Sequence, residues 1–390
     1  MHYTFWGVAT TGAARWQGGY ALAKCFPAQE IRDPADTGAK SRRMPETVTD
    51  GTPEPRSTES TAILRPGDSL EEWDRFVATS PQGCIFCTSW WLEAVAPGRF
   101  GILVLRKGGK IVAGLPMARH RKWGVETLHM PQLTQTLGPL LAPPTSTSYE
   151  KQLSAEMETL SELVAAIPKA AHFTTFCHWS LTNWLPFYWA GYQQTTRYTY
   201  VIEGLADPEA VFANFAHSKR KNVKKAEKLV EAREDLPPRE FYDHHAASLC
   251  KQGERISYSF EFFERIHRAA AEHDAGKTWF AVDAEGHIHS AIFVVFDPGS
   301  AYYLISTIDP EFRSSDSATL LVRDAIAWVS TRTKRFDFEG SMVRGVEGSF
   351  RKFGGVQKPY FHIHRNNLPL LARLALAFRE EIGRSLRAGK

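Results

Sequence analysis

Apolar side chains recur along the chain in two patterns, one typical of strands and one typical of helices. Alternating apolar positions indicate strands, because successive side chains of a strand point to opposite faces. This pattern predicts strands at 101–106, 110–117, 173–178, 198–202, 278–283, 287–297, 301–308, 335–338 and 361–364. Apolar positions three or four residues apart predict short helices beginning near residues 71 and 88 and longer ones at 149–166, 207–229, 240–251, 259–273 and 315–331. Because strands and helices are mixed along the chain, we expect an α/β fold with a mixed α+β sheet.

The same patterns divide the chain into four expected parts. Residues 1–60 form an extension, and the stretch 27–60 nearly lacks large apolar side chains. Such a segment cannot bury enough surface to offset its ordering entropy, so we expect disorder there. Residues 61–194 and 195–366 each have enough strands and helices for one folded domain. Residues 367–390 predict an amphipathic helix, for which packing on its own domain is favoured over peripheral contact with a membrane.

Composition narrows the class of protein and its partners. The 390 residues include 47 basic and 43 acidic side chains, a formal net charge of +4. DNA-binding domains are usually strongly basic, so we expect no DNA partner. The five cysteines lack the spacing of a disulfide framework, and no apolar stretch reaches the roughly 20 residues that span a bilayer. We therefore expect a cytoplasmic protein in a reducing compartment.

The segment 336–355, FDFEGSMVRGVEGSFRKFGG, carries the most informative chemistry. Strand alternation places Asp337 and Glu339 on one face and the two phenylalanines on the other. Carboxylates at the end of a strand beside a glycine loop lie where open α/β sheets usually place their sites. A partly buried carboxylate there can have a raised pKa and act as a general base toward an amine. The alternative is structural: Asp337 caps the loop, and Glu339 pairs with Arg344 or Arg351.

The segment 309–318, DPEFRSSDSA, leads from a predicted strand into a helix. Small residues at such a junction let backbone N–H groups at the helix start face phosphate oxygens. Asp316 does not suit that role, because it places a negative charge beside a phosphate. An ordinary helix start capped by Ser315 or Asp316 is the alternative. The candidate cofactor-binding residues are Arg313, Ser314, Ser315, Ser317 and Ala318.

Two further patterns carry charge or reactive groups. The run 217–228, HSKRKNVKKAEK, offers Arg220 as a bidentate anchor for phosphate, and its lysines, Lys224 among them, lie on roughly one side of a helix. Most charge runs are only solvated faces. Cys84 and Cys87 have redox or zinc spacing but lack further ligands and a thioredoxin-type context, so two small buried thiols before a helix are favoured. No metal site is expected.

Residues from about 70 to 364 resemble the Fem-like branch of the GNAT superfamily, which comprises tandem-domain acyl- and aminoacyltransferases. The resemblance rests above all on the block FDFEGSM…FRKFGG, and also on Arg220-x-x-Val223-x-Lys225-Ala226 and on 302–307. Weaker matches in the first half are Trp90-Trp91-Leu92 and the Leu-Gly-Pro that ends at Pro139. The resemblance implies two GNAT-like domains, with the acyl donor and the chemistry mostly in the second.

The resemblance also implies roles for individual residues. Asp337 falls at the acidic position after the penultimate strand, and Arg313 to Ala318 fall in the donor-binding loop, where a glycine of the family pattern is replaced by Asp316. The charge that stabilises an oxyanion is expected from Arg351 or Lys352. The expected substrate-binding residues are Arg220, Lys224, Tyr303 and Ser341.

Together these features predict an N-acyltransferase that transfers an acyl group from an activated donor to an amine, in cell-envelope or polysaccharide metabolism. The donor is expected to be an acyl-coenzyme A or an aminoacyl-tRNA, and the acceptor a small-molecule or lipid-linked amine. One alternative is a Fem-type aminoacyltransferase that acts on peptidoglycan precursors. The chain lacks a helical hairpin of the kind that grips tRNA, which favours the first reading. The other alternative is an inactive GNAT-like binding module. Motifs of hydrolases, metalloproteases, NTPases and dehydrogenases are missing from the sequence.

Overall fold

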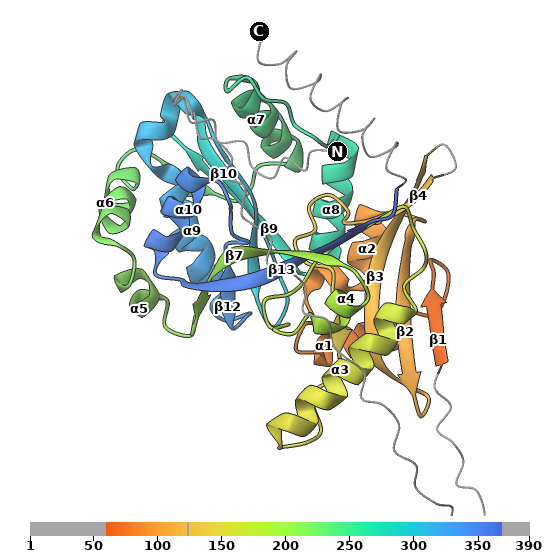
Figure 1. Cartoon of the computed structure of the whole chain (residues 1–390). Coiled ribbons are helices and arrows are strands. Elements are labelled where there is room, and N and C mark those ends of the chain that lie inside the picture. Colours follow the sequence, from red (N-terminus) through yellow and green to blue (C-terminus); the bar gives the residue numbers. More distant parts are fainter. Residues whose placement is uncertain (1–59, 123–124, 369–390) are drawn as a thin grey trace, which may run out of the picture. The chain divides into compact units, whose positions relative to one another are not determined.

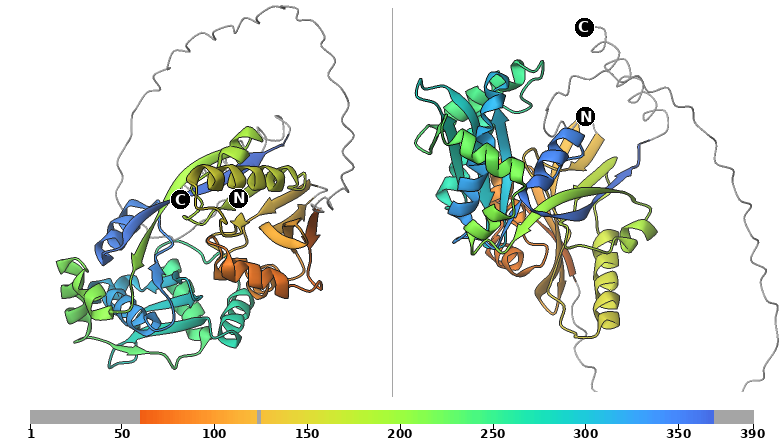
Figure 2. Two further views of the ribbon diagram at one scale, coloured as in Figure 1. Left: turned by 90° about the horizontal axis from the view of Figure 1, so that it is seen from below. Right: turned by 90° about the vertical axis from the view of Figure 1, so that its left-hand side faces the viewer.

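A sheet that runs through both halves of the sequence organises the structure (Figures 1 and 2). The computed structural model describes residues 60–122 and 125–368, so the predicted disordered extension and the C-terminal helix lie almost wholly outside the described residues. The strands are β1 (Ser60–Leu64), β2 (Phe100–Lys107), β3 (Lys110–Lys122), β4 (Val125–His129), β5 (Leu140–Leu141), β6 (His172–Phe176), β7 (Gln193–Glu203), β8 (Glu231–Arg233), β9 (Gly276–Val282), β10 (Ile288–Phe296), β11 (Ala301–Ile308), β12 (Arg335–Asp337) and β13 (Val356–Asn366).

Helices connect these strands. The α-helices are α1 (Glu71–Thr79), α2 (Ser89–Val95), α3 (Tyr149–Ala165), α4 (Leu185–Trp189), α5 (Pro208–Ala213), α6 (His217–Ala226), α7 (Pro238–Cys250), α8 (Phe260–Glu272), α9 (Ser317–Val329) and α10 (Arg344–Phe350). Three short 3₁₀ helices are η1 (Ile85–Cys87), η2 (Pro310–Ser315) and η3 (Arg351–Phe353). The predicted mixed α/β class is therefore confirmed.

The last strand joins the two halves of the sequence. The strand order is β1-β2-β3-β4-β6-β13-β7-β12-β11-β10-β9-β8, with β5 paired to β3. β13 is antiparallel to β6 on one side and to β7 on the other, where its pairs run from Val356 with Val201 to His364 with Gln193. The backbone hydrogen bonds of β13 therefore tie first-half strands to second-half strands. The division at residue 194 into two GNAT-like domains stays a proposal.

Helices cover both faces of the strands β9, β10 and β11 (Figure 1). α9 packs on one face, where Leu321 and Ile326 join a cluster with Phe336 and Phe338. α7 and α8 pack on the other face, where Phe241 and Phe263 belong to a second cluster. Because strand side chains alternate, each of these strands contributes to both clusters. This arrangement explains the nearly continuous apolar runs in β10 and β11, which are typical of strands buried on both faces.

The sequence-based boundaries were wrong in one functionally important place. The helix predicted over 207–229 breaks into α5 and α6. At the break, the buried Phe215 packs edge-on against Phe353 with ring centroids 5.1 Å apart, and the Ala216 N–H donates to the Lys352 carbonyl at 2.8 Å. Tertiary contacts thus end one helix and start the next. The short elements β1, β4, β5, β8 and α4 were not predicted. The longer predicted elements are present, although β3, β7 and β13 each extend five residues beyond one end of the predicted strand.

Gly340 is required by the turn that follows β12, and its replacement tests this turn. Its φ is 68°, and a Cβ atom there would lie 1.9 Å from the Tyr198 carbonyl oxygen. We expect Gly340→Ala to lower the free energy of unfolding by more than about 2 kcal/mol, because left-handed backbone and steric overlap both penalise alanine. Urea denaturation measures the change.

Gly348 provides the matched control. It lies in α10, and the nearest atom to an added Cβ is Nη2 of Arg351 at 3.8 Å. Gly348→Ala should leave stability unchanged or raise it by up to about 1 kcal/mol, since alanine favours helices. Equal effects of the two substitutions would contradict the role given to Gly340.

Candidate active site

The two parallel strands β11 and β12 part after two residue pairs, and a cavity opens where they part. Ala301 pairs with Phe336 and Tyr302 with Asp337, after which β12 ends while β11 continues to Ile308. The cavity has a volume of about 1050 Å³. It is lined by the later part of β11, by the starts of α9 and α10, by α6 and α7, and by first-half residues near Met130. Ligand sites of open α/β sheets lie at such carboxyl ends of strands.

The predicted donor-binding loop lies only partly in the cavity wall. Arg313, Ser317 and Ala318 line the cavity. Ser314 is exposed and lies outside this lining, and Ser315 is buried, with its hydroxyl accepting from the Ser317 N–H at 3.4 Å. η2 ends at the start of α9, so the first turn of α9 faces a cavity in which helix N–H groups can meet an anion.

Asp316 also lines the cavity, but α6 holds its carboxylate. Asn222 donates to one carboxylate oxygen at 2.9 Å, and the Lys225 ammonium lies 3.4 Å from the other. The residue adopts left-handed backbone, with φ 61°, as it leads into α9. From the sequence, the negative charge of Asp316 was expected to oppose phosphate binding. In the structure, contacts with α6 balance that charge.

Lys219 is a cavity residue that the sequence reasoning missed. Its ammonium donates to the Ser349 hydroxyl at 2.9 Å and lies 4.1 Å from the centre of the Phe353 ring. Burial lowers the pKa of Lys219 to about 8, a fall that the Asp316 carboxylate opposes. The ammonium is thus the main form at neutral pH, next to the first turn of α9. The sequence analysis preferred Arg220 for its bidentate guanidinium. Arg220 lies about 100° further around the helix than Lys219.

Of the predicted substrate-binding residues, one lines the cavity and three lie outside its lining. Tyr303 lines the cavity, and burial raises the pKa of its phenol to about 12, so the hydroxyl is neutral at neutral pH. Arg220 instead donates to the Ala213 carbonyl at 2.7 Å and to the Phe215 carbonyl, which closes the end of α5. Lys224 is exposed outside the cavity lining, and Ser341 accepts from the Val343 N–H at 3.1 Å within its own turn.

Asp337 and Glu339 are buried away from the cavity lining, with 5% and 3% of their surfaces exposed. Asp337 accepts from the Thr199 hydroxyl and, at 2.7 Å, from the Glu339 N–H, and burial raises its pKa to about 6. Burial and the neighbouring Asp337 and Cys84 raise the pKa of Glu339 well above its usual range. The general-base role predicted for Asp337 stays a prediction, and in this placement its carboxyl does not line the cavity. The suggested pairing of Glu339 with Arg344 or Arg351 is also absent among the described contacts, where neither carboxylate oxygen of Glu339 has a hydrogen-bond partner.

The predicted oxyanion residues Arg351 and Lys352 are exposed and do not line the cavity. Arg351 lies 3.7 Å from the Glu347 carboxylate, one helical turn earlier. Lys352 contributes its backbone carbonyl to the start of α6. Of the cations expected from the sequence, Arg313 lines the cavity. Lys219, Arg99, Arg119 and Arg255 also line it and were not predicted.

Comparisons with known proteins agree with this geometry. Residues 213–348 match the family model described as an acetyltransferase (GNAT) domain. This segment contains α6, the start of α9, Tyr303 and Asp337. No curated protein matches the sequence.

Solved structures extend the likeness beyond the GNAT domain. The crystal structure of FemX aligns with 81% of this chain and 99% of its own, with a TM-score of 0.59 and 11% identity. A tandem GNAT protein from the clavulanic acid biosynthesis pathway aligns with 80% of this chain and 99% of its own, with a TM-score of 0.50 and 13% identity. At such identities the likeness shows the fold, and it confirms the resemblance to Fem-like, tandem GNAT proteins at that level.

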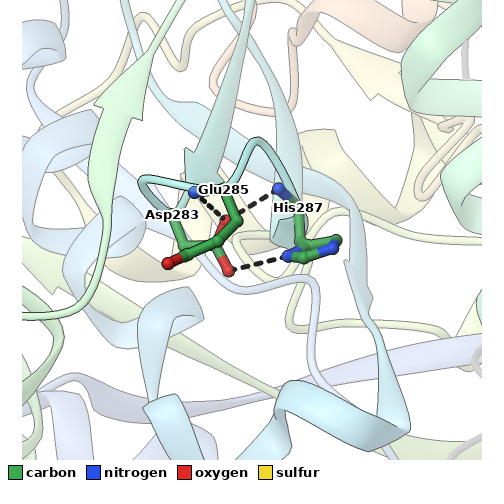
Figure 3. A group of neighbouring side chains, drawn as sticks. All are labelled: Asp283, Glu285 and His287. Atoms are coloured by element: carbon green, nitrogen blue, oxygen red, sulfur yellow. Dashed lines mark hydrogen bonds and ion pairs between the residues drawn. The ribbon is translucent and has the colours of Figure 1, made fainter.

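A hairpin outside the GNAT cavity brings potential metal ligands together (Figure 3). Asp283, Glu285 and His287 place ligand atoms within 4.8 Å of one another. However, Asp283 already accepts from the backbone N–H groups of Glu285 and His287 and from the rings of His287 and His289, at 2.8–3.1 Å. Burial opposes ionisation, but these hydrogen bonds outweigh it and lower the pKa of Asp283 to about 2. The group is therefore a hydrogen-bonded turn.

Cys84 and Cys87 are buried beside α2, as the sequence favoured, with sulfur atoms 3.6 Å apart. Cys84 also contacts the Thr136 hydroxyl at 3.4 Å. Among the described residues, no helix is both long and apolar enough to cross a membrane.

The raised pKa of Asp337 predicts a specific dependence of stability on pH. The native carboxyl binds its proton up to about pH 6, whereas the unfolded one releases it near its ordinary pKa of 3.8. Stability from this group therefore falls as pH rises through that window, by about 3 kcal/mol in total. In urea denaturation, the free energy of unfolding of wild type should fall by about this much relative to that of Asp337→Asn between pH 4 and pH 7. A constant difference between the two proteins across that range would show that Asp337 is ionised normally.

Proposed function

We propose that the protein is an N-acyltransferase that transfers an acyl group from a coenzyme A thioester to an amine. The GNAT domain and the tandem-GNAT fold support an acyltransferase, and GNAT domains generally use acyl-coenzyme A as donor. The observation that carries the proposal is the convergence of the α9 start, Lys219 and Tyr303 on one cavity where β11 and β12 part.

The residues at the start of α9 fit a diphosphate group. The start of α9, the Lys219 ammonium and the Arg313 guanidinium supply positive potential to the cavity. Asp316, the acidic residue beside them, has its carboxylate held by Asn222 and Lys225. Bound there, the coenzyme A thioester would supply the activated acyl group. Lys219 and Arg313 would hold its phosphates, and the Tyr303 hydroxyl would keep a proton available for the leaving sulfur.

His129 lines the cavity, and we assign it to accept the proton of the amine. Its Nδ1 donates to the Met130 carbonyl at 2.9 Å, so Nε2 carries the free lone pair. Burial lowers the pKa of His129, so the imidazole is neutral at neutral pH. Asp337, the base expected from the sequence, lies outside the cavity lining.

Donor binding tests the proposal through Lys219. Calorimetric titration with acetyl-coenzyme A should give an affinity about 10- to 100-fold weaker for Lys219→Met than for wild type, because a charge-assisted hydrogen bond is lost. Phosphate oxygens stabilise the ammonium, so binding raises the pKa of Lys219 and takes up a proton. Since the free protein loses this proton near pH 8, wild-type affinity should fall as pH rises above 8, and the variant should lack this fall.

Lys224→Met is the matched control, because Lys224 is an exposed lysine on the same helix and lies outside the cavity lining. It should bind the donor like wild type. Equal losses in both variants would mean that the helix attracts the donor only through its total charge. Binding of a charged tRNA without binding of the coenzyme would replace the proposal by the Fem-type aminoacyltransferase.

The proton acceptor is tested separately. We expect His129→Gln to lower kcat by about 10²- to 10⁴-fold, the usual contribution of a general base, and to leave donor affinity unchanged. Release of free thiol, followed with a colorimetric thiol reagent, measures kcat. An unchanged kcat would remove His129 from the chemistry while leaving donor binding by Lys219 intact.

A further inference from the structure

We propose that the amine acceptor is an amino sugar, held by the cavity side of α7 and by Thr307 on β11. This inference rests on the proposed acyl transfer, and it names the substrate class of the same cavity.

Two buried hydroxyl groups in the cavity wall have no hydrogen-bond partner in the described part of the chain. Ser248 and Thr307 line the cavity with 2% and 3% of their surfaces exposed. Among the described residues, neither hydroxyl has a hydrogen-bond partner. A buried hydroxyl without a partner costs about 1–3 kcal/mol, so a ligand that pairs with both gains that free energy on binding.

The two hydroxyls belong to the same side of the sheet. Thr307 pairs with Ala291 of β10, and paired residues share a face. Ala291 belongs to the core cluster that includes Phe241 of α7, so Thr307 lies on the face that α7 covers. Ser248 lies on α7 itself. The donor side of the cavity, with Lys219 and the start of α9, is built from the opposite face.

The surroundings of these hydroxyls are neutral and aromatic. His245 lies one helical turn before Ser248, its Nδ1 lies 2.9 Å from the Tyr258 hydroxyl, and burial lowers its pKa to about 4. The rings of Tyr258 and Phe262, with centroids 6.1 Å apart, also belong to the wall. Of the charged residues in this wall, Arg99, Glu254 and Arg255 are exposed to solvent, and Arg119 is half-buried.

Neutral hydroxyls beside aromatic rings match the chemistry of a sugar. The hydroxyl groups of a sugar both donate and accept, so they can pair with Ser248 and Thr307 whichever way those hydroxyls turn. Its C–H faces can pack on the rings of Tyr258 and Phe262. An alkylamine would leave both buried hydroxyls without partners. The geometry therefore selects an amine that has hydroxyl groups next to it.

The experiment compares two amines of similar ring size, glucosamine and cyclohexylamine, with acetyl-coenzyme A as donor. Wild type should prefer glucosamine, with a kcat/KM at least about 10-fold higher, as two hydrogen bonds predict. Ser248→Ala and Thr307→Val should each raise the KM for glucosamine by about 3- to 15-fold. Neither variant should lower kcat/KM for cyclohexylamine or the affinity for acetyl-coenzyme A.

Thermal stability distinguishes a binding role of the two hydroxyls from a structural role. Both substitutions remove a buried hydroxyl without a partner, so neither should lower the melting temperature. Thr278→Val is the matched control: Thr278 is also buried, its hydroxyl also has no partner, and it lies outside the cavity lining. This variant should keep the wild-type KM for glucosamine.

The outcomes separate this inference from the proposed function. Suppose that the donor binds but both amines are used with equal kcat/KM, or that Ser248→Ala and Thr307→Val lower kcat/KM equally for both amines. Either result would overturn the assignment of an amino-sugar acceptor and leave the proposed acyl transfer standing. Exclusive transfer to a peptide amine would overturn that assignment as well. Absence of donor binding and of thiol release with every amine would overturn the acyl transfer itself.

Discussion

The early end of β12 beside β11 is the constraint on which the site depends. Where parallel strands stay paired, the sheet has no gap, and the side chains of its two faces remain in separate layers. Here the pairing lasts for two residues, after which the chain turns through Glu339 and Gly340 in left-handed backbone. Beyond that point both faces of β11 border one cavity. The register of β10 with β11 shifts between Phe293 and Val295, so Tyr303 and Thr307 lie on opposite faces. Tyr303, from the face that α9 covers, and Thr307, from the face that α7 covers, line the same space.

The basic helix α6 supplies the electrostatic balance of this cavity. Its cations have different surroundings although they are neighbours in sequence. Lys219 faces the cavity, Lys225 lies beside Asp316, Arg220 binds backbone carbonyls at the end of α5, and Lys224 points to solvent. Asp316 lowers the cost of burying Lys219, and Lys225 with Asn222 neutralises Asp316. The start of α9 therefore keeps its positive potential beside an acidic residue.

Sequence periodicity predicted the class of fold and most long elements, because burial on a fixed face leaves a regular pattern. The residue types of 309–318 and the family resemblance placed Arg313, Ser317, Ala318 and Tyr303 in segments that the structure brings to the cavity. The sequence could not choose between Lys219 and Arg220. That choice depends on the rotation of α6, which is set by the break around Phe215 and by contacts with Phe353, more than 130 residues away in the sequence. Ser248 and Thr307 left no signal, because an unpaired hydroxyl is visible only when its surroundings are known.

Asp337 and Glu339 show why a shifted pKa needs access to become chemistry. Both carboxyls have raised pKa values because they are buried, and burial is what removes them from the cavity. Their contacts hold the turn after β12 instead: Asp337 accepts from the Glu339 N–H, and Gln135 of the first half donates to the Glu339 carbonyl. Gln135 also contacts the Tyr360 hydroxyl of β13 at 3.3 Å. The first half thereby stabilises the turn that ends β12, and with it the opening from which the cavity arises.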